Sequence, residues 1–130
     1  MCKMLLIFSH KLTKIQKKDA INTFGCSEFL TLPNDLSKIW MQIPPTQPSL
    51  REYLQPIKNW INENASPMDF VLIQGEYGAS FLIINYVFKM NLIPIYATTE
   101  RITTEKQMPD GTIKTERVFK HKSFRKYEKE

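Results

Sequence analysis

The sequence predicts an α/β fold in which a parallel sheet carries helices on both faces. Short apolar runs suited to buried strands recur at 3–9, 69–74 and 92–99. Segments with helical periodicity separate these runs, and turn residues such as Gly25 and Pro33 lie at the junctions. Repeated strand–helix–strand units form a Rossmann-like arrangement, and here a C-terminal β-hairpin is expected to follow it.

The N-terminal half is expected to alternate strands and helices. Thr13 can cap a helix that ends at Gly25. Ser49 and Glu52 match a capping box, and Pro56 is expected to kink or divide the helix that follows. The expected elements are a strand at 3–9, a helix at 13–24, a strand at 28–32, a short helix at 35–41, a proline-rich loop at 43–48 and a helix at 49–64.

The C-terminal half is expected to end in a long hairpin. A strand at 69–74, an apolar helix at 78–91 and a strand at 92–99 come first. Residues 100–127 then alternate without helical period around a Pro-Asp-Gly turn signal. We expect one domain over 1–130, with a core at 1–99 and a basic hairpin at 100–130. In an unbulged strand, one face of the returning arm would carry Arg117, Phe119, His121, Ser123, Arg125 and Tyr127.

Composition and charge narrow the class of protein. Apolar residues make up 42% of the chain and the net charge is +5, as in an ordinary soluble domain with a basic surface. No apolar run is long enough to span a bilayer, so no membrane partner is expected. Cys2 and Cys26 are far apart in the sequence and are expected to be reduced thiols, which favours a cytoplasmic location.

Candidate site residues follow from a rule for open α/β sheets, whose ligands bind beyond the carboxyl ends of the strands. Gly75 and Gly78 would let a ligand approach the backbone, although a tight turn alone would explain them equally well. His10 is a candidate acid or base, although a lone histidine is more often structural. The rule selects as ligand-binding residues Ser9, Lys11, Gln74, Gly75, Glu76, Tyr77, Gly78, Ser80, Thr98 and Thr99, and it places His10 and Arg101 at the same edge.

Several common chemistries lack their sequence motifs. The spacing GEYG fits neither the dinucleotide nor the nucleoside-triphosphate pattern. Two histidines without clustered cysteines or aspartates do not predict a transition-metal site. We therefore expect no cofactor, and any catalysis would rest on positioning, cations and hydrogen bonds. The basic segment 117–126 holds five cations and no acid, a pattern suited to phosphate or to a charged edge strand.

Five segments together resemble a known family. LLIFSHKLT, IWMQIPP, FVLIQGEYGA, PIYATTER and RVFKHKSFRKYE are similar to segments of small stand-alone CRISPR-associated proteins of the Csx series, which accompany type III interference systems. The resemblance implies a CARF-like Rossmann fold, a homodimer and ring nuclease activity on cyclic oligoadenylate, most often cyclic tetra-adenylate. Such enzymes switch off antiviral signalling. They need no metal, because a ribose 2′-hydroxyl attacks the adjacent phosphodiester.

With this chemistry, roles for individual residues follow as hypotheses from their positions. His10 or His121 would act as general base or acid, and Arg101 and Arg125 would stabilise the phosphorane. Glu76 would repel phosphates, so its role is left open, with Arg101 or an adenine amine as candidate partners. A protein that binds the ring without cutting it is the first alternative. A basic RNA- or DNA-binding module is the second, and no stable nucleic-acid partner is expected if the ring is the ligand.

Overall fold

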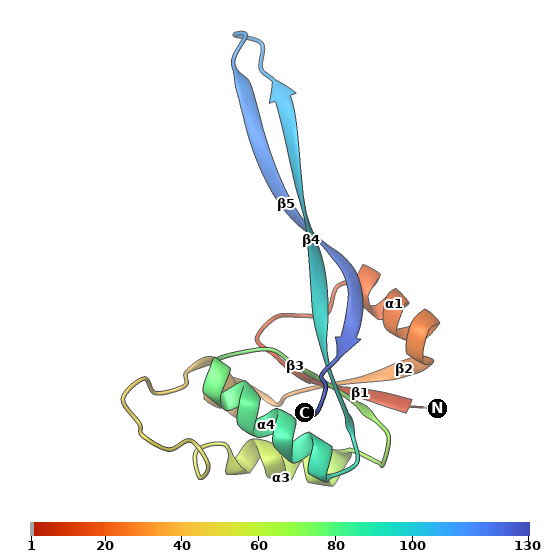
Figure 1. Cartoon of the computed structure of the whole chain (residues 1–130), viewed down its shortest axis with the longest axis vertical. Helices are drawn as coiled ribbons and strands as arrows, with labels where there is room; N and C mark the ends of the chain where they lie inside the picture. Colours follow the sequence, from red (N-terminus) through yellow and green to blue (C-terminus); the bar gives the residue numbers. More distant parts are fainter. Residues whose placement is uncertain (1) are drawn as a thin grey trace.

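The structure, a computed structural model, describes residues 2–130 as a mixed α/β fold built on one five-stranded sheet (Figure 1). The strand order is β2-β1-β3-β4-β5; the first four strands are parallel and β5 is antiparallel to β4. No helix within residues 2–130 has the length and apolar character needed to span a membrane. The elements are β1 Cys2–Ile7, α1 Lys14–Phe24, β2 Cys26–Thr31, α2 Asn34–Met41, α3 Gln55–Asn64, β3 Phe70–Ile73, α4 Tyr77–Lys89, β4 Ile93–Gln107 and β5 Ile113–Lys126.

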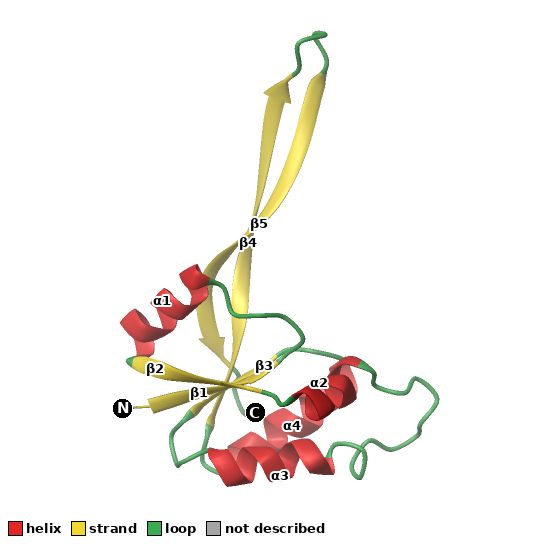
Figure 2. Ribbon diagram, turned by 180° about the vertical axis from the view of Figure 1, so that it is seen from behind, coloured by secondary structure: helices red, strands yellow, loops and turns green. Residues whose placement is uncertain are grey.

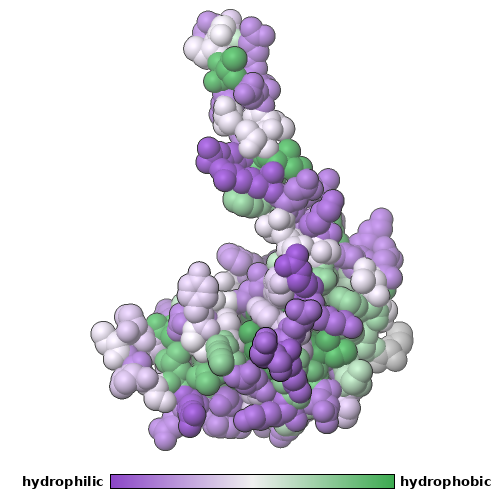
Figure 3. All heavy atoms as spheres, viewed as in Figure 1, coloured by the Kyte–Doolittle hydropathy of each residue, from purple (hydrophilic) through white to green (hydrophobic). Residues whose placement is uncertain are grey.

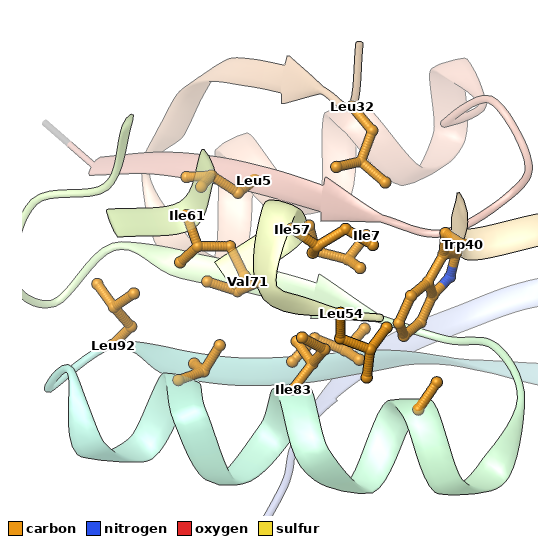
Figure 4. Packing of buried hydrophobic residues seen from close by; sticks show 13 residues of the cluster. Leu5, Ile7, Leu32, Trp40, Leu54, Ile57, Ile61, Val71, Ile83 and Leu92 are labelled. Atoms are coloured by element: carbon orange, nitrogen blue, oxygen red, sulfur yellow. The ribbon is translucent and has the colours of Figure 1, made fainter. Parts of the chain in front are cut away.

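Helices cover both faces of the sheet, as the sequence predicts (Figure 2). Helix α1 packs on one face, where Ala20 meets Met4, Leu6 and Leu72 from the central strands. Helices α2, α3 and α4 pack on the other face, and Figure 4 shows their side chains against alternate residues of the same strands. Each central strand is buried on both sides because successive side chains point to opposite faces.

Two helix boundaries illustrate what local sequence does and does not determine. Helix α1 starts at the predicted cap, where Thr13 and Gln16 form a capping box, and it ends at Gly25 with φ 72°. Helix α3 begins at Gln55, so the predicted start at Ser49 is wrong. Pro56 lies in the first turn, where its missing N–H removes no helical hydrogen bond.

The hairpin is present and longer than the sequence predicts. Strand β4 continues unbroken through the predicted boundary at residue 99, and the turn places Gly111 at φ 87°. The pairing shifts between Thr98, which faces Ser123, and Thr99, which faces His121. Lys122 is the extra residue, so the side chains of β5 change faces there. The predicted common face is therefore wrong: one face carries residues 117, 119 and 121, and the opposite face carries 123 and 125.

The cysteines also correct a prediction. Cys2 on β1 and Cys26 at the start of β2 form a disulfide, and their Cα atoms lie 4.9 Å apart. The parallel register of β1 and β2 places these two residues opposite each other. Their wide separation in the sequence gives no sign of this contact. The expectation of reduced thiols is wrong, and the argument for a cytoplasmic location that depended on it falls away.

Candidate functional site

The loop after β3 is fixed by contacts within the protein. The indole Nε1 of Trp40 donates to the backbone oxygen of Gln74 at 3.0 Å. The side-chain Oε1 of Gln74 accepts from the Ala97 N–H at 2.9 Å. Gln74 therefore connects the end of β3 to α2 on one side and to β4 on the other. Its predicted ligand-binding role would be added to this structural one.

The two glycines of this loop differ in what a side chain would meet at each position. A Cβ on Gly75 would lie 2.7 Å from the ring atoms of Trp40, so a side chain is excluded by packing. A Cβ on Gly78 would lie 3.2 Å from the Glu76 carboxylate and 3.8 Å from Cδ1 of Leu50. That carboxylate accepts the Gly78 N–H and caps α4. Glu76 thus has a partner in its own helix, which differs from the expected pairing with Arg101 or adenine.

An aromatic cavity opens beside this loop. Its volume is about 710 Å³, and Figure 3 shows hydrophobic surface over the start of α4, on which several of its lining residues lie. Four predicted ligand-binding residues line it: Gln74, Gly75, Tyr77 and Ser80. The rings of Phe81, Phe88, Tyr96 and Tyr127 complete the wall, together with Ile84, Asn85 and residues 128–130.

The sequence reasoning did not assign these four additional aromatic residues to the site. On α4, Tyr77, Phe81 and Phe88 are spaced four and seven residues apart, which places them on one helical face. That spacing was a usable signal. Tyr96 and Tyr127 come from β4 and from the end of the chain, and only the tertiary fold brings their rings to a centroid distance of 4.6 Å.

Polar atoms in and behind the cavity wall are mostly held by partners. The Tyr127 hydroxyl donates to the Ile73 backbone oxygen at 2.7 Å, and burial raises the pKa of the Tyr127 phenol. The Arg125 Nη1 donates to the Tyr96 hydroxyl at 2.9 Å. The Ser80 Oγ is buried and has no hydrogen-bond partner within residues 2–130. Ser80 is therefore a polar group that a bound molecule could satisfy.

This combination suits a flat ring with polar edges. Exposed aromatic side chains provide stacking surfaces, and Tyr77 is 94% exposed. Asn85, Ser80 and the backbone around Gly75 offer hydrogen-bonding groups. Lys129 lines the same cavity, with its Nζ 5.1 Å from the centroid of the Phe88 ring. A nucleobase has this pattern of apolar faces and polar edges, whereas Glu128 and Glu130 in the same lining offset the charge of Lys129.

The carboxyl end of β1 lies next to the carboxyl end of β3 in the sheet. The strand order reverses between these two strands, and ligands of open α/β sheets bind at such a point. Ser9 lines a smaller hollow of about 260 Å³ with Trp40, Gly75 and Glu76. Because Gly75 lines both cavities, the two hollows adjoin. His10 and Lys11 are exposed just beyond Ser9.

His121 does not belong to either hollow. Its Nε2 lies 2.8 Å from the Asp19 carboxylate on α1, and its side chain is only 7% exposed. Burial acts to raise the pKa of Asp19, but hydrogen bonds from Thr23 and His121 outweigh it and hold that pKa below its ordinary value. His121 therefore fastens the hairpin to α1, on the face of the sheet opposite the cavity.

The remaining predicted residues are dispersed along the hairpin. Arg125 reaches the cavity wall through Tyr96, whereas Arg101 lies farther out, opposite Phe119. The Thr98 hydroxyl pairs with Ser123, and Thr99 faces His121. The four predicted catalytic residues, His10, His121, Arg101 and Arg125, are thus not brought together within one chain.

Residues 2–130 contain no group of three or more His, Cys, Asp or Glu side chains arranged to hold a metal ion.

Comparison with known proteins gives a full-length relative. It is the uncharacterized protein MJ1673 of Methanocaldococcus jannaschii, 47% identical over 127 residues, which cover 98% of each chain. No solved structure matches. A family model described as the uncharacterized protein MJ1673 family matches residues 2–125. The chain therefore belongs to the MJ1673 family.

Proposed function

We propose that this protein is a metal-independent ring nuclease that binds a cyclic oligoadenylate and opens it. The observation that carries the proposal is the aromatic cavity beside the carboxyl end of β3, which four predicted ligand-binding residues line. The strand order β2-β1-β3-β4 agrees with a Rossmann-like, CARF-like fold. The resemblance of five sequence segments to small CRISPR-associated proteins supplies the ligand class.

Each part of the ligand has a candidate partner. Adenine rings would stack on Tyr77 and the neighbouring aromatic side chains of the cavity. Ser80 and Gln74 would bond polar edges of base or ribose. Phosphates would be neutralised by Lys129, Lys11 and Arg125, which lie in the cavity wall, at the β1 edge and behind Tyr96 respectively. A homodimer would double this set for a symmetric ring.

The reaction needs positioning more than a strong base. The ribose 2′-oxygen forms a bond to the adjacent phosphorus as the bond from phosphorus to the 5′-oxygen breaks. The 2′-hydroxyl proton leaves and the departing 5′-oxygen gains one, giving a 2′,3′-cyclic phosphate and a 5′-hydroxyl. Of the two predicted histidines, His10 is the exposed one at the ligand-binding edge, so it is the candidate for proton transfer.

A protein that sequesters the ring without cutting it is the second candidate. The observation that favours it is the dispersal of the predicted catalytic residues, with His121 engaged by Asp19. Incubation with cyclic tri-, tetra- and hexa-adenylate in EDTA separates the two candidates. The ring nuclease yields linear products ending in a 2′,3′-cyclic phosphate. Tight binding with return of the intact ring would support sequestration, and binding of no ring would contradict both.

A matched pair of variants tests the cavity itself. Tyr77→Ala removes an exposed stacking ring and is expected to weaken ring binding by about 1–3 kcal/mol with little effect on folding. Phe119→Ala removes a 68% exposed ring on the hairpin, away from the cavity, and serves as the control. Equal loss of affinity in the two variants would contradict the cavity assignment. Isothermal titration with the cyclic tetra-adenylate makes the measurement.

A further inference from the structure

The outer hairpin is a ribbon of two strands that contacts helix α1 at its base. We define the arm as residues 99–121. His121 fastens its base to α1, and the outer part projects away from the helices (Figures 1 and 2). No residue of the arm belongs to the buried core, and Ile113, Val118 and Phe119 are exposed apolar side chains. A two-stranded ribbon is only marginally stable in water unless something packs on it or extends it. A partner for this surface is therefore physically reasonable.

The charge of the arm favours a protein partner over nucleic acid. Acids interrupt the cations on both strands, whereas phosphate binding requires a surplus of cations. Lys114 lies 3.7 Å from Glu116, which shows one such neutralised pair. The arm holds five cations, Arg101, Lys106, Lys114, Arg117 and Lys120, against four acids, Glu100, Glu105, Asp110 and Glu116.

One edge of β4 is open along the arm. Strand β3 pairs with β4 only from Ile93 to Ile95. The next group on the β3 side of β4 is the Ala97 N–H, which donates to the Gln74 side chain. Along a strand, the N–H and C=O groups of successive residues point to opposite edges. The bulge lies in β5, so this alternation continues without a break along β4. Alternate residues from Thr99 through Thr103 to Gln107 therefore present N–H and C=O groups at the open edge.

The sequence along this edge is complementary to itself. In an antiparallel pair related by a two-fold axis at Thr103, that residue faces its own copy. Arg101 then faces Glu105 and Glu100 faces Lys106, each twice. Moving the axis by one residue, to position 102 or 104, pairs none of these charges with an opposite charge. The pattern thus selects a single register.

We propose that two copies of this chain pair edge to edge through β4 of the arm, forming a four-stranded antiparallel sheet with the order β5-β4-β4-β5. The contact needs no ligand and goes beyond the proposed function. The two bodies lie at opposite ends of the paired arms, so a dimer built around the candidate cavity would use a different surface. A chain that uses both surfaces forms a closed tetramer when the two axes intersect at right angles and an open filament otherwise.

The edge of β5 is a poorer template for the same contact. A two-fold axis at Val118 would pair Glu116 with Lys120 favourably. The bulge at Lys122 interrupts the regular backbone of this edge, so a partner strand could not follow it beyond His121. The β4 edge is regular and carries no like-charge pair in its register, so it is the edge that the arm offers to a second copy.

Charge reversal and charge exchange test the register. Glu105→Arg places like charges opposite each other twice and is expected to raise the dissociation constant of the arm contact about tenfold or more. Adding Arg101→Glu in the same chain restores opposite charges and is expected to restore association. Arg117→Glu lies on β5, opposite Thr103 of its own chain, and is the control. Sedimentation velocity over a range of protein concentrations, without ligand, reports the mass.

The masses of the wild type and of the three variants decide whether the arm contact exists. The proposal is supported if Glu105→Arg halves the mass of the assembly, the exchanged double variant restores it and the Arg117→Glu control is unchanged. It is overturned if the wild type stays monomeric, or if the double variant remains dissociated. Monomers that bind linear RNA through Arg101 would also overturn it and assign the arm to nucleic acid. Circular dichroism of each variant excludes unfolding as the cause of dissociation.

Discussion

The body and the arm of this protein are stabilised in different ways. Every residue of the buried core lies between Met4 and Ile95, packed in two clusters on the two faces of the sheet. The arm, residues 99–121, has none. Burial of apolar area therefore stabilises the body, whereas the arm depends on its turn, on cross-strand pairs and on the contact at its base. Substitutions should accordingly have very different effects in the two regions.

The largest difference is expected for one residue type placed in each region. Ile57 on α3 is fully buried, and Ile57→Ala is expected to lower the free energy of unfolding by about 2–5 kcal/mol. Ile113 on the arm is 65% exposed, and Ile113→Ala is expected to change it by less than about 0.5 kcal/mol. Urea unfolding followed by far-UV circular dichroism measures both. Similar losses in the two variants would mean that the arm unfolds together with the core.

The next effect concerns the loop of the candidate site. Gly75→Ala forces a Cβ against Trp40 and is expected to cost about 1–3 kcal/mol of stability, with a change in tryptophan fluorescence. Gly78→Ala is the matched control, because its Cβ would meet the end of the Glu76 side chain at 3.2 Å and Leu50 at an ordinary 3.8 Å, and because Gly78 lies in a helix. If Gly75→Ala were as stable as the wild type, Trp40 would have to move aside easily.

The same division explains which predictions succeed. Elements of the body could be placed from local signals, since the cap at Thr13, the stop at Gly25 and the apolar runs of β1 and β3 act within a few residues. Four of the residues that the carboxyl-edge rule selected, Gln74, Gly75, Tyr77 and Ser80, line one cavity, and their role in binding stays a prediction. These signals depend on periodicity and on backbone preferences that the sequence displays directly.

The failures involve contacts between distant residues. The bulge at Lys122 has no sequence signature, yet it moves His121 and Arg125 to opposite faces. The disulfide between Cys2 and Cys26 depends on the register of two strands. Tyr96 lines the cavity because the fold places β4 next to α4. Local pattern reasoning cannot supply such pairings, because they are determined by the packing of the whole chain.

A smaller effect is expected where the arm joins the body. The pKa of Asp19 is lower in the folded state, so its charge contributes stability above the unfolded pKa that is lost as the pH falls through the folded value. Asp19→Asn is expected to cost about 1.5 kcal/mol near pH 7 by weakening the contact to His121. The difference from the wild type should shrink as the pH approaches 3.

Urea unfolding of both proteins from pH 7 down to pH 3 provides the measurement. Glu63→Gln on α3 is the control, since this exposed carboxylate has no ion pair within residues 2–130. A difference between wild type and Asp19→Asn that stayed constant over the whole range would show that the Asp19 charge has no part in fastening the hairpin.

The smallest expected effect concerns Gly25 and Gly111, two glycines whose backbone is left-handed. Gly25 ends α1 at φ 72° and Gly111 lies in the hairpin turn at φ 87°, and neither has an atom within 4 Å of an added Cβ. Alanine is strained by about 1 kcal/mol at either position, because left-handed backbone suits glycine. Gly25→Ala should lower the global free energy of unfolding by that amount. Gly111→Ala should leave it nearly unchanged and instead increase amide exchange in residues 99–121, because a ribbon without a core opens independently of the body. Equal global losses would show that the turn and the core fold as one cooperative unit.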